Sequence, residues 1–187
     1  MKINNKYILA SASPRRKELF AKISNDFCII PSKAEEKLSN ELLADEQSEY
    51  LAKIKALDIA NKYPENTVVG ADTSVVIDNV ILGKPKDKIK AKEMLKLLSG
   101  KTHKVITGCA IVKNGSCFSF SEITLVKFKD LTNEQIEEYI STDEPYDKAG
   151  SYAIQGKAGA FIESINGDFD NVVGLPIEKL KKQLQII

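Results

Sequence analysis

Short apolar runs alternate with a segment of helical character in the first part of the chain. Residues 7–10 are apolar and predict a buried strand. Pro14 suits the first turn of a helix that continues through Phe20, and Ser13 is placed to cap that helix. Residues 27–30 form another short apolar run, which ends at a proline. The chain is therefore expected to begin as strand, helix and strand.

A longer helix is predicted over residues 45–62, where apolar positions follow the helical period. Residues 67–77 then form a strand run that carries one acid, Asp72, among uncharged neighbours. An ionised carboxylate between buried strands is unfavourable alone, so we expect Asp72 to have a partner. The Asp-Asn pair at 78–79 predicts a turn into a second strand at 80–82.

The next part of the chain predicts a helix and then antiparallel strands. The helix covers residues 88–98 and is capped by Asp87. Residues 102–112 and 116–128 are rich in β-branched and aromatic side chains, and they flank Asn-Gly at 114–115. Asn-Gly between such runs is a strong hairpin signal. A long two-stranded arm is therefore expected.

The last part of the chain mixes loops with short elements. The Thr-x-x-Gln sequence at 132–135 fits a capping box for another helix, and the polar, glycine-punctuated residues 141–159 predict a loop. Residues 161–165 and 169–173 flank a second Asn-Gly pair and predict another hairpin. A final amphipathic helix opens at Pro176.

Length and charge limit the possible functions. With 187 residues, 43% of them hydrophobic, and no linker-like segment, the chain predicts one two-lobed domain over residues 1–187. The net charge is +1, and interleaved lysines and acids leave no basic face for nucleic acid. No apolar stretch reaches membrane length and no signal peptide is evident, so we expect a cytoplasmic protein without a membrane partner.

Cysteine and histidine usage disfavours several kinds of site. The three cysteines are odd in number and have no CxxC spacing, which argues against a disulfide framework and a thiolate metal site. His103 is the only histidine. A Ser-His-Asp or Cys-His mechanism would therefore depend on this one residue, which has a lysine beside it.

Arginine usage points to a local anion site. Of the 27 lysines and arginines in the chain, only Arg15 and Arg16 are arginines. Two cations in a first helical turn oppose the helix dipole unless an anion neutralises them. Free backbone N–H groups, the hydroxyls of Ser11 and Ser13 and two planar guanidiniums meet at this strand-to-helix turn, which favours phosphate binding. The alternative is a capped helix with solvated arginines.

Seven motifs in order carry a resemblance to a known family. They are SASPRR at 11–16, EEKL at 35–38, GADT at 70–73, LGKP at 82–85, LSG at 98–100, EPYDKAGSYAIQG at 144–156 and GLP at 174–176. From residue 8 to about residue 180 the chain resembles the Maf proteins, which are nucleoside triphosphate pyrophosphatases. The one small departure is Lys33, where an acid is usual.

The resemblance implies a fold and a substrate class. The expected fold is α/β, an elongated mixed β-sheet flanked by helices with a central cleft, related to the inosine triphosphatase architecture. A homodimer is also expected. The Tyr-Ala-Ile-Gln-Gly segment at 152–156 resembles the branch that hydrolyses dTTP and UTP, whereas the branch acting on 7-methyl-GTP carries a different sequence there.

The implied chemistry assigns roles to charged residues. Release of pyrophosphate requires water to attack the α-phosphorus, and catalysis is mostly positioning and charge neutralisation. Arg15 and Arg16 can grip phosphate oxygens bidentately, beside Ser11 and Ser13. Further phosphate-binding point charges are expected from two lysines, Lys53 and Lys84, for which ordinary surface solvation is the alternative.

The remaining roles concern metal, proton transfer and base choice. Glu35 and Asp72 make an oxygen-only site that suits Mg²⁺ or Mn²⁺, and Asp72 is also the expected acceptor of the water's proton. By resemblance, Arg15, Thr73 and Gln155 are tied to base choice. The Gln155 amide offers a donor and an acceptor to the O4 and N3–H edge of uracil or thymine. The alternative for Gln155 is a loop-stabilising amide.

Two other functions fit part of the sequence. Apolar residues leading into Asp-Thr-Ser at 72–74 resemble the aspartic-protease signature, in which two chains would share a carboxylate dyad. This hypothesis leaves the SASPRR and EPYDKAG motifs without a role. The Maf resemblance also suggests a non-catalytic nucleotide-binding regulator of cell division or septum formation, which would keep the pocket without turnover.

Overall fold

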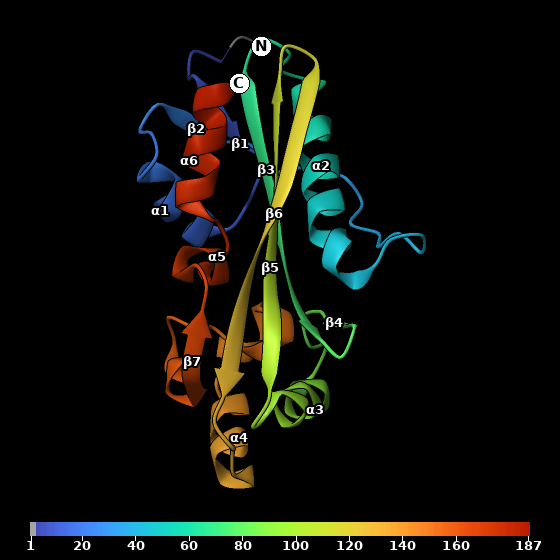
Figure 1. Ribbon diagram of the computed structural model, residues 1–187, viewed down its shortest axis with the longest axis vertical. Coiled ribbons are helices and arrows are strands. Elements are labelled where there is room, and N and C mark those ends of the chain that lie inside the picture. The colour runs from blue at the N-terminus through green and yellow to red at the C-terminus, as the bar shows by residue number, and fades with distance from the viewer. Residues whose placement is uncertain (1–2) are drawn as a thin grey trace.

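The computed structural model describes residues 3–187 and shows an elongated molecule built along one twisted sheet (Figure 1). The strands are β1 (Tyr7–Leu9), β2 (Phe27–Ile29), β3 (Thr67–Ile77), β4 (Val80–Leu82), β5 (Thr102–Lys113), β6 (Ser116–Phe128) and β7 (Ile162–Asn166). Their order is β2-β1-β3-β5-β6-β7, with β4 paired to β3. β1 runs parallel to both of its neighbours and the other pairs are antiparallel. The predicted mixed sheet is therefore confirmed.

The helices cover different parts of this sheet. They are α1 (Pro14–Ala21), α2 (Gln47–Ala60), α3 (Lys88–Leu98), α4 (Asn133–Ile140), α5 (Phe169–Val173) and α6 (Ile177–Ile186), with short 3-10 turns at Ala44–Glu46, Glu144–Asp147, Ala149–Ser151 and Lys157–Phe161. α1 and α6 lie on one side of β1 and β3, and α2 lies on the other side (Figure 1). Within residues 3–187, no helix is long and apolar enough to cross a membrane.

Strand alternation explains this layering. Successive side chains of a strand point to opposite faces of the sheet. Leu9 and Val69 face the cluster with α1 and α6, whereas Ile8 and Val68 face the cluster with α2. At the opposite end of the sheet, α3 and α4 bury their apolar residues against β3, β5 and β6. Between these two ends, the central strands carry polar residues.

The predicted caps of α1, α3 and α4 and the predicted turns at 78–79 and 114–115 are confirmed. Asp78, Asn79, Asn114 and Gly115 all have positive φ, as a two-residue type I′ turn requires. Ser13 accepts a hydrogen bond from the Arg16 N–H, and similar caps begin α3 and α4. Local turn and cap chemistry therefore places these elements without help from distant residues.

The second predicted hairpin is wrong, because Phe169–Val173 forms α5 and not a strand. The Asp168 side chain accepts from the Asp170 N–H and begins the helix. The amide of buried Asn171 donates to the Val105 carbonyl at 3.1 Å and to Thr124 Oγ1 at 2.9 Å. These partners lie far away in the sequence, so the tertiary contact decides the conformation of a short apolar run that local pattern leaves ambiguous.

His103 is a buried polar residue on β5. Its side chain is 2% exposed, and its Nε2 lies 2.7 Å from the Tyr152 hydroxyl. Among residues 3–187, its Nδ1 has no hydrogen-bond partner. Burial lowers the pKa of His103 from 6.5 to about 4. The native protein therefore holds a neutral imidazole at a pH where the unfolded chain is already protonated.

We predict that this histidine makes the protein less stable in mild acid. The pKa of His103 is depressed in the folded state. Its neutral side chain therefore contributes fully to the free energy of unfolding above pH 6.5, and this contribution is lost as the pH falls toward 4. Between pH 7 and pH 5 the loss should be about 2 kcal/mol. Urea unfolding of the parent and of His103→Gln at both pH values measures it. An equal drop in both proteins would contradict the assignment.

Candidate functional site

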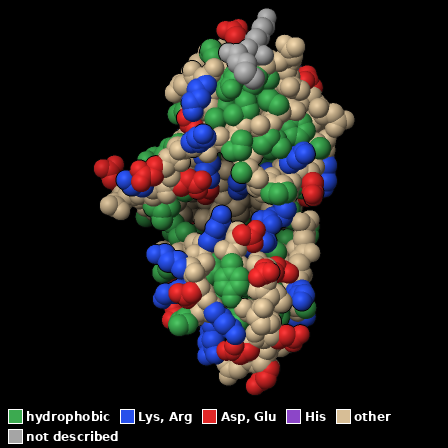
Figure 2. All heavy atoms as spheres, turned by 180° about the vertical axis from the view of Figure 1, so that it is seen from behind, with side chains coloured by type: hydrophobic (Ala, Val, Ile, Leu, Met, Phe, Trp, Pro, Cys, Tyr) green, Lys and Arg blue, Asp and Glu red, His purple; other side chains and the backbone are tan. Residues whose placement is uncertain are grey.

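A cavity of about 430 Å³ lies where the sheet edge is open. β1 pairs with β3 only as far as Leu9 and Val69, and β4 pairs with β3 only at 75–77. Among residues 3–187, β3 therefore has no strand neighbour on this side in between. Figure 2 shows the hollow across the middle of the molecule, with Lys, Arg, Asp and Glu side chains around it. Its walls come from residues 10–16, 72–73, 147–149, 152–155 and 172–174, and from Pro31, Ser32, Glu36, Lys55, Val75, Lys84 and Val105.

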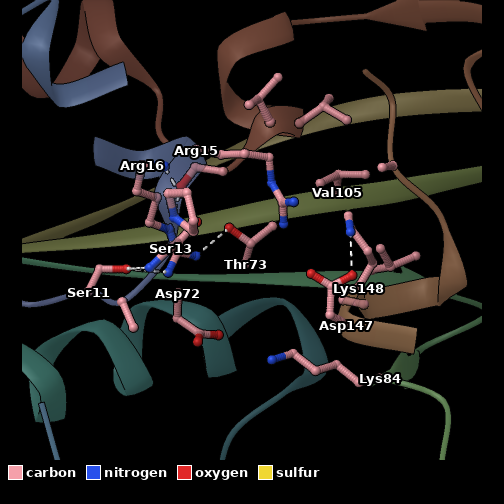
Figure 3. A pocket seen from close by; sticks show the side chains of 18 of the residues that line it. Ser11, Ser13, Arg15, Arg16, Asp72, Thr73, Lys84, Val105, Asp147 and Lys148 are labelled. Atoms are coloured by element: carbon pink, nitrogen blue, oxygen red, sulfur yellow. Dashed lines mark hydrogen bonds and ion pairs between the residues drawn. The ribbon is translucent and has the colours of Figure 1, made fainter. Parts of the chain in front are cut away.

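Arg16 joins three segments of the cavity wall. Its Nε donates to the Gly174 carbonyl at 2.8 Å, and its two terminal nitrogens donate to Ser11 Oγ at 3.3 Å and Thr73 Oγ1 at 2.9 Å (Figure 3). Burial lowers the pKa of Arg16, while the negative charge of Asp72 opposes that shift. The guanidinium is therefore largely committed to holding the wall together.

The hydroxyls behind Arg16 form a directed chain. Thr107 Oγ1 donates to the Asn171 carbonyl at 2.9 Å, so it accepts from Thr73 Oγ1, which is also 2.9 Å away. Thr73 in turn accepts from Arg16. Each of the two hydroxyls in this series of hydrogen bonds donates once, which fixes the orientation of the Thr73 side chain beside the cavity.

Arg15 is the arginine left free. Its side chain extends into the cavity, and among residues 3–187 it has no side-chain hydrogen bond or ion pair (Figure 3). Asp147 lies across from it, with Lys148 as its ion-pair partner. Burial acts to raise the pKa of Asp147, but the hydrogen bond and charge of Lys148, with a smaller effect of Arg15, hold that pKa below its usual value. The five donors of Arg15 therefore remain available to a ligand.

The partner expected for Asp72 is Lys55, which sequence analysis did not identify. Lys55 Nζ lies 2.6 Å from Asp72 Oδ1 and 3.1 Å from Glu36 Oε2. The Lys55 side chain is 11% exposed and that of Asp72 14%. A signal was present in the sequence, because Lys55 falls between Leu51 and Ile59 on the apolar face of its helix. A lysine at such a position needs a carboxylate.

Two glycines allow α2 to come this close to the sheet. A Cβ on Gly70 would stand 2.4 Å from the Ala52 carbonyl oxygen, and one on Gly108 would stand 2.2 Å from the Glu49 nitrogen. Both obstacles are backbone atoms that cannot move aside cheaply. The absence of these side chains therefore brings Lys55 within reach of Asp72.

The structure does not bring Lys53 or Glu35 into the cavity. Lys53 lies on the outer side of α2, where its ammonium is 3.5 Å from Glu49. Glu35 has a 73% exposed side chain and pairs with Lys37. In each case a neighbour along the chain, Lys55 or Glu36, lines the cavity instead. Spacing alone could not tell which of two nearby residues points inward.

The other predicted site residues do meet at the cavity. Its lining includes the six predicted residues Ser11, Ser13, Arg15, Arg16, Asp72 and Thr73 from one side and the predicted Lys84 and Gln155 from the other. The side chains of Asp72 and Lys84 approach each other across it (Figure 3). Cationic side chains therefore converge from both ends of the molecule, which suits a polyanionic ligand.

A metal ion would find few protein ligands here. Within the described residues, no group of three or more His, Cys, Asp and Glu side chains is arranged to hold a metal ion. Asp72 and Glu36 do converge, since both contact the ammonium of Lys55. One or two carboxylates fit a hard cation such as Mg²⁺, which takes its other ligands from water and phosphate.

Comparison with known proteins identifies close relatives. The family model described as Maf-like protein matches residues 6–187. A Bacillus cytotoxicus protein named dTTP/UTP pyrophosphatase is 49% identical over 180 residues, which cover 96% of this chain and 94% of that protein. A Thermococcus gammatolerans protein of the same name is 49% identical over 175 residues, covering 94% and 93%.

Solved structures share the fold at low sequence identity. The Staphylococcus aureus Ham1 protein matches with a TM-score of 0.59 and 14% identity, covering 96% of this chain and 97% of that one. The Coxiella burnetii HAM1 protein matches with a TM-score of 0.56 and 13% identity, covering 97% and 98%. These likenesses confirm the predicted α/β fold of the inosine triphosphatase type.

We predict that the two arginines differ in what they do for stability. Arg16→Lys cannot reproduce the three-way contact with Ser11, Thr73 and Gly174, so unfolding should become easier by about 2 kcal/mol. Arg15→Lys, the matched control, should change stability by less than about 0.5 kcal/mol. Urea unfolding measures both. Equal losses would contradict this division.

Proposed function

This chain belongs to the Maf-like protein family, and we propose that it hydrolyses nucleoside triphosphates, with dTTP and UTP as substrates, to the monophosphate and pyrophosphate. Relatives that cover nearly the whole chain are named for this activity. The observation that carries the proposal is Asp72, a carboxylate held by Lys55 at the open sheet edge and faced by cationic side chains.

The phosphates are the natural ligands of the cationic lining. Arg15 has its donors free and can grip phosphate oxygens in two places, while Lys84 and Lys148 approach from the opposite wall as point charges. Ser11 and Ser13 add hydroxyls at the strand-to-helix turn. Lys55 takes the position beside Asp72, whereas Lys53 stays outside the cavity. Arg16 supports this arrangement from behind.

Asp72 is the proposed proton acceptor. A water held beside it loses a proton to the carboxylate and attacks the α-phosphorus, and the bond from that phosphorus to the bridging oxygen of pyrophosphate breaks. Negative charge grows on the leaving pyrophosphate, and Arg15, Lys84 and Lys148 neutralise it. Ion pairing to Lys55 keeps the Asp72 carboxylate fixed in the cavity.

We propose that base choice depends on Arg15, Thr73 and Gln155, all of which line the cavity. Arg15 can only donate, whereas Gln155 can donate and accept, as the O4 and N3–H edge of thymine and uracil requires. We also propose a homodimer, as the family resemblance implies, and a cytoplasmic location. Ile123 and Leu125 lie on the same face of β6 and are 43% and 38% exposed, which offers apolar surface for contact between copies.

Mg²⁺ or Mn²⁺ is the proposed cofactor, with Asp72 as one ligand. When bound, the ion would polarise phosphate oxygens and lower the pKa of a water molecule. The sequence assigns the second carboxylate to Glu35, but Glu36 is the one that lines the cavity and converges with Asp72. Glu35 could reach the cavity only if its loop moved.

We predict that Asp72→Asn removes turnover and leaves the fold intact. Loss of the accepting oxygen should lower kcat by about 10²–10⁴-fold. A pyrophosphate-release assay on dTTP and UTP, with thermal melting of the same sample, measures this effect.

Asp147→Asn is the matched control, since Asp147 also lines the cavity. Normal turnover in Asp72→Asn with loss in Asp147→Asn would move the base to Asp147. Nucleotide binding without turnover by the parent would support the regulator hypothesis.

We predict that turnover requires a divalent cation. Excess EDTA should abolish pyrophosphate release, and Mg²⁺ or Mn²⁺ should restore it. Titration of the metal with Glu36→Gln and Glu35→Gln then separates the two adjacent glutamates. The variant that needs roughly tenfold more metal identifies the second ligand. Full activity in excess chelator would exclude the metal proposal.

A further inference from the structure

The base-reading residue of the proposed function has no side-chain anchor of its own. Gln155 is exposed at the cavity, and among residues 3–187 its amide makes no hydrogen bond. The position of its side chain therefore depends on the backbone of the segment 152–158.

Glu144 holds the C-terminal side of the segment. One carboxylate oxygen, Oε2, accepts from the Lys157 N–H at 3.0 Å. The other, Oε1, accepts from the Ala158 N–H at 3.4 Å and from the Tyr139 hydroxyl at 3.0 Å. Glu144 thus joins α4 to the backbone directly after Gln155.

The contact between the Glu144 carboxylate and the backbone of residues 156–158 is close, and it involves a charged group. A Cβ on Gly156 would stand 2.1 Å from Glu144 Oε1, so only glycine lets the carboxylate approach so near. No lysine or arginine within the described part of the chain forms an ion pair with Glu144, and backbone donors take the place of one. Hydrogen bonds from amides to an ionised carboxylate are about twice as strong as neutral ones.

The N-terminal side of the segment is held differently. Tyr152 is buried, and its hydroxyl lies 2.7 Å from His103 Nε2 in the sheet. The rings of Tyr152 and Phe128 pack edge to face at 4.9 Å. The segment is therefore fixed at both ends, by an aromatic anchor before Gln155 and by a carboxylate after it.

We propose that Glu144 is a positioning residue for nucleobase recognition, which acts by fixing the backbone that presents Gln155. The inference rests on the proposed function for the identity of the ligand. It assigns Glu144 no contact with the reacting atoms, because Glu144 does not line the cavity and Asp147 does.

Two ligands separate positioning from general damage to the pocket. dTTP carries the base, whereas inorganic tripolyphosphate offers only the phosphate chain. Binding of both is measured by calorimetry in chelating buffer, for the parent, Glu144→Gln, Gln155→Ala, and the double variant. Glu144→Gln should weaken dTTP roughly tenfold and leave tripolyphosphate unchanged. In the Gln155→Ala background the same substitution should have no further effect.

Hydrogen exchange tests the anchor without any ligand. In Glu144→Gln the amides of Lys157 and Ala158 should exchange faster than in the parent. Glu138→Gln is the matched control, because Glu138 is exposed on α4 and its side chain makes no hydrogen bond or ion pair to the segment 152–158. That variant should behave as the parent in all three measurements.

Three results would overturn the inference: equal weakening of both ligands, a loss that persists in full without the Gln155 side chain, or unchanged exchange at Lys157 and Ala158. Pyrophosphate release by the parent is assayed separately. If the parent releases none, the proposed function fails, while the binding and exchange measurements still decide the role of Glu144.

Discussion

The ion pair between Lys55 and Asp72 is the constraint on which the site depends. A carboxylate on a central strand is unfavourable unless a cation reaches it, and that cation comes from α2. α2 comes close enough only because Gly70 and Gly108 have no side chains. The packing of α2 against the sheet and the pairing of Asp72 with Lys55 are therefore one requirement, which the same few residues satisfy.

Charge in the cavity is divided between fixed and available groups. Arg16 is bound to three segments, and Lys55 is bound to two carboxylates. Arg15 and Lys84 have no such partners among residues 3–187 and extend into the cavity (Figure 3). The hydrogen bonds and ion pairs of Arg16 and Lys55 hold the cavity wall together despite the repulsion between cations. Arg15 and Lys84 can therefore bind an anion without rearrangement of the wall. Such preorganisation is what electrostatic catalysis requires.

The far wall of the cavity is built on a different principle. Residues 144–161 form short 3-10 turns rather than a strand or a long helix, so few of their backbone groups are paired regularly. Side-chain contacts replace regular backbone pairing: buried Tyr152 contacts His103 on one side of Gln155, and half-buried Glu144 accepts from the backbone on the other. An irregular segment can therefore present an exposed amide at a defined place.

The sequence by itself determined the features that depend on neighbours along the chain. Caps at Ser13 and Asp87 and the turns at 78–79 and 114–115 follow from local chemistry, and ordered motifs identified the family and most of the cavity lining. Tertiary structure decided the rest. Phe169–Val173 became a helix through the distant partners of Asn171, and Lys55 and Glu36, not Lys53 and Glu35, turned toward Asp72. Which of two nearby side chains faces a site depends on helix orientation against the sheet, and that orientation is set by contacts between residues far apart in the sequence.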